Sequence, residues 1–169
     1  MNLRANRWPG ADYWKKGDTA EIGCTLADLG AFLDTCEVVV PGLDGGGLDD
    51  LYGLTLVGRH KVSKEWISWT HAWAHIGVLE RRKSIAPRLM DFKTAGELTI
   101  VSDELEDISA IVEIIRDVKD RGLLACVAAD AAGLGEMVEA LDEIGITQEA
   151  GLIVAAPQGI MMMNAIKTT

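Results

Sequence analysis

The chain has few cysteines and no long apolar run, and each of these absences excludes a class of protein. Only Cys24, Cys36 and Cys126 occur among the 169 residues, and no two of them have CxxC spacing. An odd number of cysteines, with no secretory signal before them, argues against a disulfide framework and favours reduced thiols. Gly, Asp or Pro interrupts every apolar run well before the roughly 18 residues that a membrane helix needs. We therefore expect a soluble, cytoplasmic protein with no membrane partner.

Basic residues are also scarce. Sixteen Lys and Arg stand against twenty-six Asp and Glu, giving a net charge of -10. Such a charge repels nucleic acid unless the positive residues gather on one face or lie in another subunit. The composition therefore argues against a free-standing DNA-binding protein. With 49% hydrophobic residues, the chain is long enough for one well-packed domain and too short for two.

The most informative segment that is present is 37–59, EVVVPGLDGGGLDDLYGLTLVGR. An apolar run ends on Asp44, turns through Gly45, Gly46 and Gly47, and enters a second apolar run. Glycine tolerates positive φ and allows a ligand to approach the backbone closely, so these residues predict a tight turn beside a bound group. A hairpin whose first strand ends on Asp is typical of the start of ribonuclease H-like and actin-like folds.

Periodicity predicts the remaining elements. Residues 66–75 alternate as a strand does, although Trp66, Trp69 and Trp73 also have a helical spacing that leaves a helix open. The expected elements are strands at 37–43, 51–60, 66–75, 97–101, 123–129 and 151–156, and helices from Asp103 to about Gly122 and at 134–144. This order predicts an α/β fold with a ribonuclease H-like mixed sheet: three antiparallel strands, then helix, strand, helix and strand, with helices on both faces. Residues 1–36, with a short helix at 26–34, are expected to be a lead-in segment on the outside of a 37–169 domain.

Two distant acids are the leading site candidates. Asp44 and Asp130 each end a strand, and the two strands are predicted neighbours at the centre of the sheet. Ligands of open α/β sheets collect at the carboxyl ends of strands, and two carboxylates there need a cation between them. Their hard oxygen ligands favour Mg²⁺ or Mn²⁺, and two such ions about 3.5 to 4 Å apart hydrolyse phosphodiesters. The alternative is that both aspartates only cap turns or helices. Asp50 is a further candidate metal ligand, whereas Asp49 is expected to be an ordinary turn residue.

Three other groups have structural explanations that we prefer. His71 and His75 resemble a helical zinc pair only if their segment is a helix, and no third ligand stands at suitable spacing. The three tryptophans between 66 and 73 could stack on bases, but they more often fill a core or an interface. A compact basic cluster, formed by Arg81, Arg82, Lys83 and Arg88, is more often a solvated loop than a phosphate contact.

Four segments in order carry a more specific signal: GLDGGGLDDLYGLTLVGR, DFKTAGELTIV, LLACVAADAAGLGEMVEALDEIGI and QGIMMMNAIKTT. Together, over about residues 7–169, they resemble the nuclease domain of the terminase large subunit of tailed bacteriophages. The resemblance implies a ribonuclease H-like endonuclease that cuts concatemeric double-stranded viral DNA during DNA packaging, with Asp44 as the first-strand metal ligand and Asp130 as the second acid. It also implies Mg²⁺ or Mn²⁺ as cofactor and the bacterial host cytoplasm as location. The implied partners are the terminase ATPase domain, the small terminase subunit and the portal protein.

The sequence departs from that family in two respects. It contains no GxxxxGK[ST] phosphate loop, so it is not expected to act as a packaging motor by itself. The family supplies a further acid or histidine after the segment that matches 158–169, so we expect an incomplete catalytic set, as in a truncated prophage gene or a split gene, and weak or no nuclease activity from these residues alone. Two alternatives stay open: an actin-like ATPase or sugar-kinase lobe, and a non-catalytic packaging module.

Overall fold

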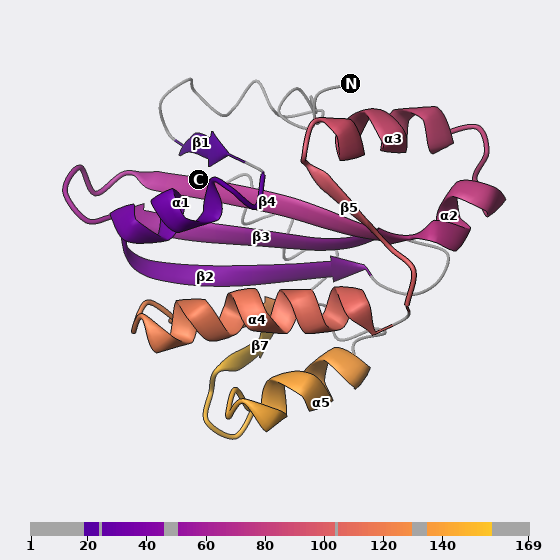
Figure 1. Ribbon diagram of the computed structural model, residues 1–169. Helices are drawn as coiled ribbons and strands as arrows, with labels where there is room; N and C mark the ends of the chain where they lie inside the picture. Colours follow the sequence, from indigo (N-terminus) through magenta and orange to yellow (C-terminus); the bar gives the residue numbers. More distant parts are fainter. Residues whose placement is uncertain (1–18, 24, 46–50, 104, 130–134, 157–169) are drawn as a thin grey trace.

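A computed structural model describes residues 19–23, 25–45, 51–103, 105–129 and 135–156 of the chain. Within these ranges, one seven-stranded sheet carries helices on both faces (Figure 1). The elements are, in chain order, β1 (Thr19–Gly23), α1 (Leu29–Thr35), β2 (Cys36–Gly45), β3 (Leu51–His60), β4 (Trp66–His75), α2 (Ile76–Arg81), α3 (Ala86–Thr94), β5 (Leu98–Val101), α4 (Glu106–Asp120), β6 (Val127–Ala129), α5 (Gly135–Glu143) and β7 (Ile153–Ala155).

The strand order is β1-β4-β3-β2-β6-β7, with β5 also paired to β4. Strands β2, β3 and β4 form an antiparallel meander, β6 pairs parallel to β2, and β7 pairs parallel to β6. Both β1 and β5 run parallel to β4, β1 along its first half and β5 along its second. Only β3 therefore runs against the other strands, and the predicted mixed sheet of three antiparallel strands followed by helix, strand, helix and strand is confirmed.

The burial of alternate residues in β4 decides between the strand and the helix that its sequence allowed. Ile67, Trp69, His71 and Trp73 are buried, and Ser68, Thr70 and Ala72 between them are partly exposed. A period of two places successive side chains on opposite faces of a sheet. The helical spacing of the tryptophans is therefore coincidental, and the segment is a strand.

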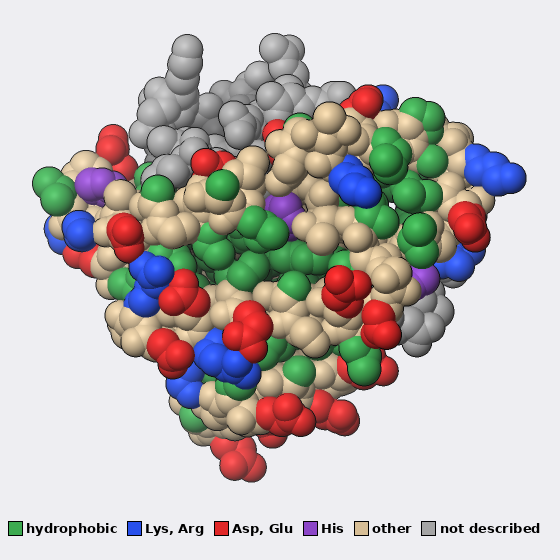
Figure 2. Space-filling view, in the orientation of Figure 1, with side chains coloured by type: hydrophobic (Ala, Val, Ile, Leu, Met, Phe, Trp, Pro, Cys, Tyr) green, Lys and Arg blue, Asp and Glu red, His purple; other side chains and the backbone are tan. Residues whose placement is uncertain are grey.

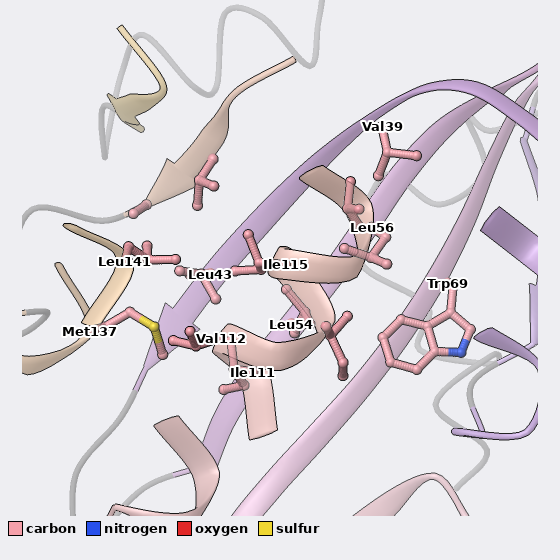
Figure 3. Packing of buried hydrophobic residues seen from close by; sticks show 14 of the residues in the cluster. Val39, Leu43, Leu54, Leu56, Trp69, Ile111, Val112, Ile115, Met137 and Leu141 are labelled. Atoms are coloured by element: carbon pink, nitrogen blue, oxygen red, sulfur yellow. The ribbon is translucent and has the colours of Figure 1, made fainter. Parts of the chain in front are cut away.

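One face of the sheet packs against α4 and α5, where the main core lies. Figure 3 shows Ile115 of α4 beside Leu43 of β2, and Val112 of α4 beside Met137 of α5, all within the main core cluster. The expected capping of this helix by Asp103 and Glu106 is wrong in detail, because the helix begins after Leu105 and its first turn has no side-chain cap. In the turn before the helix, Asp103 Oδ1 accepts from the Leu105 N–H at 2.9 Å and Glu106 Oε2 accepts from the Ser102 N–H at 3.3 Å. Gly122 follows the helix with a φ of 71°, as expected of a residue just past a helix end.

The opposite face carries α2 and α3. A smaller core cluster joins Val78 and Leu89 of these helices to Ala74 and Leu98 of β4 and β5. Because Trp73 belongs to the main cluster and adjacent strand residues point to opposite faces, Ala74 and this small cluster lie on the other side. The expectation of helices on both faces is confirmed. The segment with the basic cluster, expected to be a solvated loop, instead contributes to two helices, α2 and α3.

The N-terminal part contributes more than was expected. Phe32 and Leu33 of α1 are 0% and 1% exposed and belong to the main core, and β1 is a strand of the sheet. The prediction that this part only packs on the outside is therefore wrong for residues 25–36. Phe32 is buried because its ring packs over Gly58 of β3, which has no side chain of its own. A Cβ added at Gly58 would lie 3.0 Å from Phe32 Cζ. The boundaries of the 37–169 domain stay a prediction.

The described cysteines and helices bear on the expected absence of disulfides and of membrane spans. Cys36 and Cys126 are free thiols, and Cys24 lies outside the described residues. Burial raises the pKa of the Cys36 thiol, which donates to the Phe32 carbonyl at 3.2 Å. Among the described helices, none has the length and apolar character needed to span a bilayer.

Candidate active site at the carboxyl edge

Several strands reach their C-terminal ends at one end of the sheet, here called the carboxyl edge. Because β2, β4, β5, β6 and β7 run in the same direction, their last residues lie toward that end, and Figure 1 shows the ends of β2, β4 and β5 on the right. Helices α2, α4 and α5 follow β4, β5 and β6 and begin there. Open α/β sheets bind ligands at this edge, so a candidate active site is expected there.

Asp44 lies at the carboxyl edge, one residue before the end of β2. Its side chain is exposed, and its backbone pairs with Gly53 of β3. The preceding residue, Leu43, pairs with Ala129 of β6, which immediately precedes Asp130 in the sequence. The strands that lead into the two predicted acids are thus parallel neighbours, as expected. Asp130 itself, with Asp49 and Asp50, lies outside the described residues, so the meeting of the carboxylates stays a prediction.

Two further acids, which sequence analysis missed, lie at the same edge. Asp107 is in the first turn of α4, and Glu136 is in the first turn of α5. The pKa of Tyr52 of β3 is raised chiefly by burial and then by the negative charges of both carboxylates. Acids in the first turn of a helix usually interact with the helix dipole, so their presence in the sequence did not by itself indicate a site. The usable signal was that each helix directly follows a strand of the parallel set.

Asp107 is the more perturbed of the two. Burial raises the pKa of its carboxyl, while the Ile108 N–H, which donates to Oδ1 at 2.7 Å, and the nearby His75 lower it. Among the described residues it forms no salt bridge. A half-buried carboxylate that forms no salt bridge and has only a histidine nearby is a group that a bound cation would stabilise.

The two histidines of β4 are engaged in other contacts. His75 Nδ1 accepts from the Gly77 N–H at 3.1 Å, and its Nε2 donates to the Ser102 carbonyl at 3.0 Å. His71 is buried between Trp69 and Trp73, with Nε2 at 2.9 Å from Thr99 Oγ1. The segment is a strand and not a helix, so the helical zinc pair is excluded.

The tryptophans divide between the core and the surface. Trp69 and Trp73 are 0% and 1% exposed, and the Trp69 indole donates to the Thr25 carbonyl at 2.9 Å. Trp66 is 47% exposed on the other face of β4. The preference for a core role is confirmed for the two buried rings, which are not available to stack on bases.

Carboxylates near this edge offer the ligand atoms that a hard divalent cation prefers, but the described ones do not form a group of three. Asp44, Asp107 and Glu136 present carboxylate oxygens, which Mg²⁺ and Mn²⁺ prefer. No three potential metal ligands lie together among the residues that the structure describes. A complete metal centre therefore requires side chains beyond these ranges, and Asp130 and Asp50 are the candidates that the sequence supplies.

The strand order, with one reversed strand in the meander and helical crossovers to β6 and β7, defines a ribonuclease H-like α/β domain. Its fold is similar to the crystal structure of the HK97 bacteriophage large terminase, with a TM-score of 0.58 and 23% sequence identity. The likeness covers 78% of this chain and 27% of the HK97 protein, so the chain spans about a quarter of that terminase. No family model and no curated protein matches the sequence. The domain is thus terminase large-subunit-like in fold, as the sequence resemblance predicted.

Proposed function

We propose that this chain is the metal-dependent endonuclease domain of a phage DNA-packaging terminase, which hydrolyses phosphodiester bonds of concatemeric double-stranded DNA. The observation that carries the proposal is the parallel pairing of Leu43 with Ala129, because these residues directly precede Asp44 and Asp130. The likeness to the HK97 large terminase supports the same assignment at the level of the fold.

In this proposal Asp44, Asp130 and Asp50 hold two Mg²⁺ or Mn²⁺ ions. Bound divalent metal activates a water and stabilises the leaving oxygen of the phosphodiester. The exposure of Asp44 leaves its oxygens accessible to a metal and to substrate. Asp107 and Glu136 add negative charge that attracts cations to this edge, and the raised pKa of Tyr52 keeps its phenol protonated as a neutral neighbour.

The proposed partners follow from the same assignment. They are double-stranded DNA, the terminase ATPase domain, the small terminase subunit and the portal protein, in the cytoplasm of the bacterial host. The absence of a GxxxxGK[ST] phosphate loop in this sequence is consistent with ATP hydrolysis belonging to a separate domain.

Metal binding is the direct test, because nuclease activity of this chain alone is expected to be weak. Calorimetry with Mn²⁺ should show binding by the 169-residue chain, and Asp44→Asn should weaken it by about tenfold or more, since a ligand is removed. The matched control is Asp120→Asn, the same chemical change at an exposed position on α4 at the opposite end of the sheet. Equal Mn²⁺ affinity in the wild type and both variants would contradict the proposal.

Nicking of supercoiled plasmid in Mn²⁺ gives a second readout. Any cleavage should disappear in Asp44→Asn and persist in Asp120→Asn. Calorimetric binding of ATP would instead favour an actin-like or kinase-type lobe. Binding of a packaging protein without any metal affinity would favour a non-catalytic module.

A further inference from the structure

The helical pair α2–α3 has a charge opposite to that of the rest of the chain. Between Ile76 and Thr94, five basic residues stand against two acidic ones, in a chain whose net charge is -10. We call the five the basic rim; all are exposed, and they are Arg81, Arg82, Lys83, Arg88 and Lys93. Figure 2 shows Lys and Arg side chains over these helices on the right of the molecule.

The helices of the basic rim begin beside the carboxyl edge. Helix α2 begins at Ile76, directly after β4 reaches the carboxyl edge, and in the sheet Ala72 of β4 and Asp44 of β2 both pair with Gly53 of β3. The helices of the basic rim cover one face of the sheet, whereas Asp107 and Glu136 come from helices on the other. The edge therefore has a negative side suited to metal and a positive side suited to an anion.

The basic rim is held rigidly on the sheet. Val78 and Leu89 are buried against Ala74 and Leu98, and the turn between the helices is closed by the Arg82 carbonyl, which accepts from the N–H groups of residues 85 and 86 at 3.0 and 3.1 Å. The guanidinium of Arg81 folds back over the first turn of α2. Its Nη1 would lie 2.9 Å from a Cβ added at Gly77. Such anchoring fixes where the positive charges stand before any partner arrives.

Part of this charge is uncompensated. Lys83, Arg88 and Lys93 form no salt bridge with any residue that the structure describes. Positive charges without salt bridges, gathered on one surface of an acidic protein, attract polyanions to that surface.

We propose that the basic rim binds the phosphate backbone of double-stranded DNA and holds the duplex across the carboxyl edge. This inference rests on the proposed nuclease function and adds the surface by which an acidic domain grips its substrate. Phosphate contacts of this kind position the duplex without reading its sequence, so binding should be independent of sequence and strongly dependent on salt.

The test measures DNA binding without cleavage. Fluorescence anisotropy of a short labelled duplex, in EDTA and over a range of salt concentrations, compares the wild type with Lys83→Gln/Arg88→Gln. Loss of two phosphate contacts should reduce the slope of log affinity against log salt by about 2 and weaken binding at moderate salt about tenfold. The matched control is Lys61→Gln/Arg116→Gln, which removes the same charge from the opposite end of the sheet and should bind as the wild type does.

Each other outcome has a defined meaning. Equal losses in the test and control variants would reduce the effect to net charge and overturn the inference, as would a wild type that does not bind DNA or one that binds poly-glutamate equally well. Thermal unfolding should show both double variants folded, because exposed substitutions change stability little. Mn²⁺ calorimetry on Lys83→Gln/Arg88→Gln should be unchanged, so a failure of the basic rim and a failure of the Asp44 metal site are distinguishable.

Discussion

The two ends of the sheet use charge differently. At the amino edge, where β2 and β4 begin, several charges form ion pairs: Glu37 pairs with Arg59 and Lys64, and Asp34 pairs with Arg121, which also contacts Asp117. At the carboxyl edge and on the helices that follow β4, Asp107, Lys83, Arg88 and Lys93 form no salt bridge among the described residues.

This difference indicates what each end does. Exposed ion pairs contribute little stability each, but the charges within them are already compensated. An acid and bases without salt bridges, carried by helices on opposite faces of the sheet, remain available for a cation and for a polyanion. Three substitutions test whether the amino edge is structural and the carboxyl edge functional.

The largest effect is expected from Gly58→Ala, at the amino end of the sheet. An added Cβ would overlap Cys36 Sγ and press on the Phe32 ring, so the variant should lose about 1 to 3 kcal/mol of unfolding free energy. Denaturant unfolding measures this loss. Mn²⁺ affinity and DNA binding of the remaining folded protein should be unchanged, because this site is remote from Asp44.

Gly30→Ala is the matched control for that substitution. Gly30 lies in α1 with nothing within 4 Å of an added Cβ, and replacing a helical glycine with alanine should stabilise by roughly 0.5 to 1 kcal/mol. The double variant Gly58→Ala/Cys36→Ala should recover part of the loss, because it relieves the overlap. Equal stability of the Gly58 variant and the wild type would show that α1 does not pack as described.

A smaller effect is expected from Asp107→Asn at the carboxyl edge. The pKa of Asp107 is raised in the folded protein, so its carboxylate opposes folding at neutral pH, and that penalty disappears as pH falls below the ordinary carboxyl pKa. The asparagine variant, which keeps the oxygen that accepts from Ile108, should therefore melt slightly higher than the wild type at pH 7. The difference should shrink toward acid pH, as thermal melts at several pH values can show. A lower melting temperature at pH 7 would contradict the assignment of a desolvated carboxylate.

The smallest effect is expected from Glu37→Gln at the amino edge. The hydrogen bond from Lys64 lowers the pKa of the Glu37 carboxyl. Its contribution to stability is present above the ordinary glutamate pKa and is lost as pH falls through the lower folded value, so the variant should be slightly less stable at neutral pH and equal to the wild type in acid. The pH dependence is thus opposite in sign to that of Asp107→Asn. The same sign in both variants would break the comparison between the two edges.

Local patterns predicted the elements whose burial follows their own periodicity. The alternation in 66–75 and the apolar stripe of α4 both appear in the structure because each element buries one face along its whole length. The same reasoning missed β1, which is short, and missed helices α2 and α3, whose few buried residues give only a weak stripe. It also placed Phe32 outside the core, since nothing near that residue in the sequence reveals the bare glycine of β3 that it covers.

The sequence by itself determined that Asp44 follows an apolar strand and that the α2–α3 segment is basic, because composition and local order are properties of the chain. Only the tertiary structure decided that β2 lies beside β6, that Asp107 and Glu136 approach Tyr52, and that the basic rim stands on the opposite face of the same edge. Strand neighbours are chosen by packing and pairing between segments far apart in sequence, and the direction shared by parallel strands then brings their carboxyl ends together.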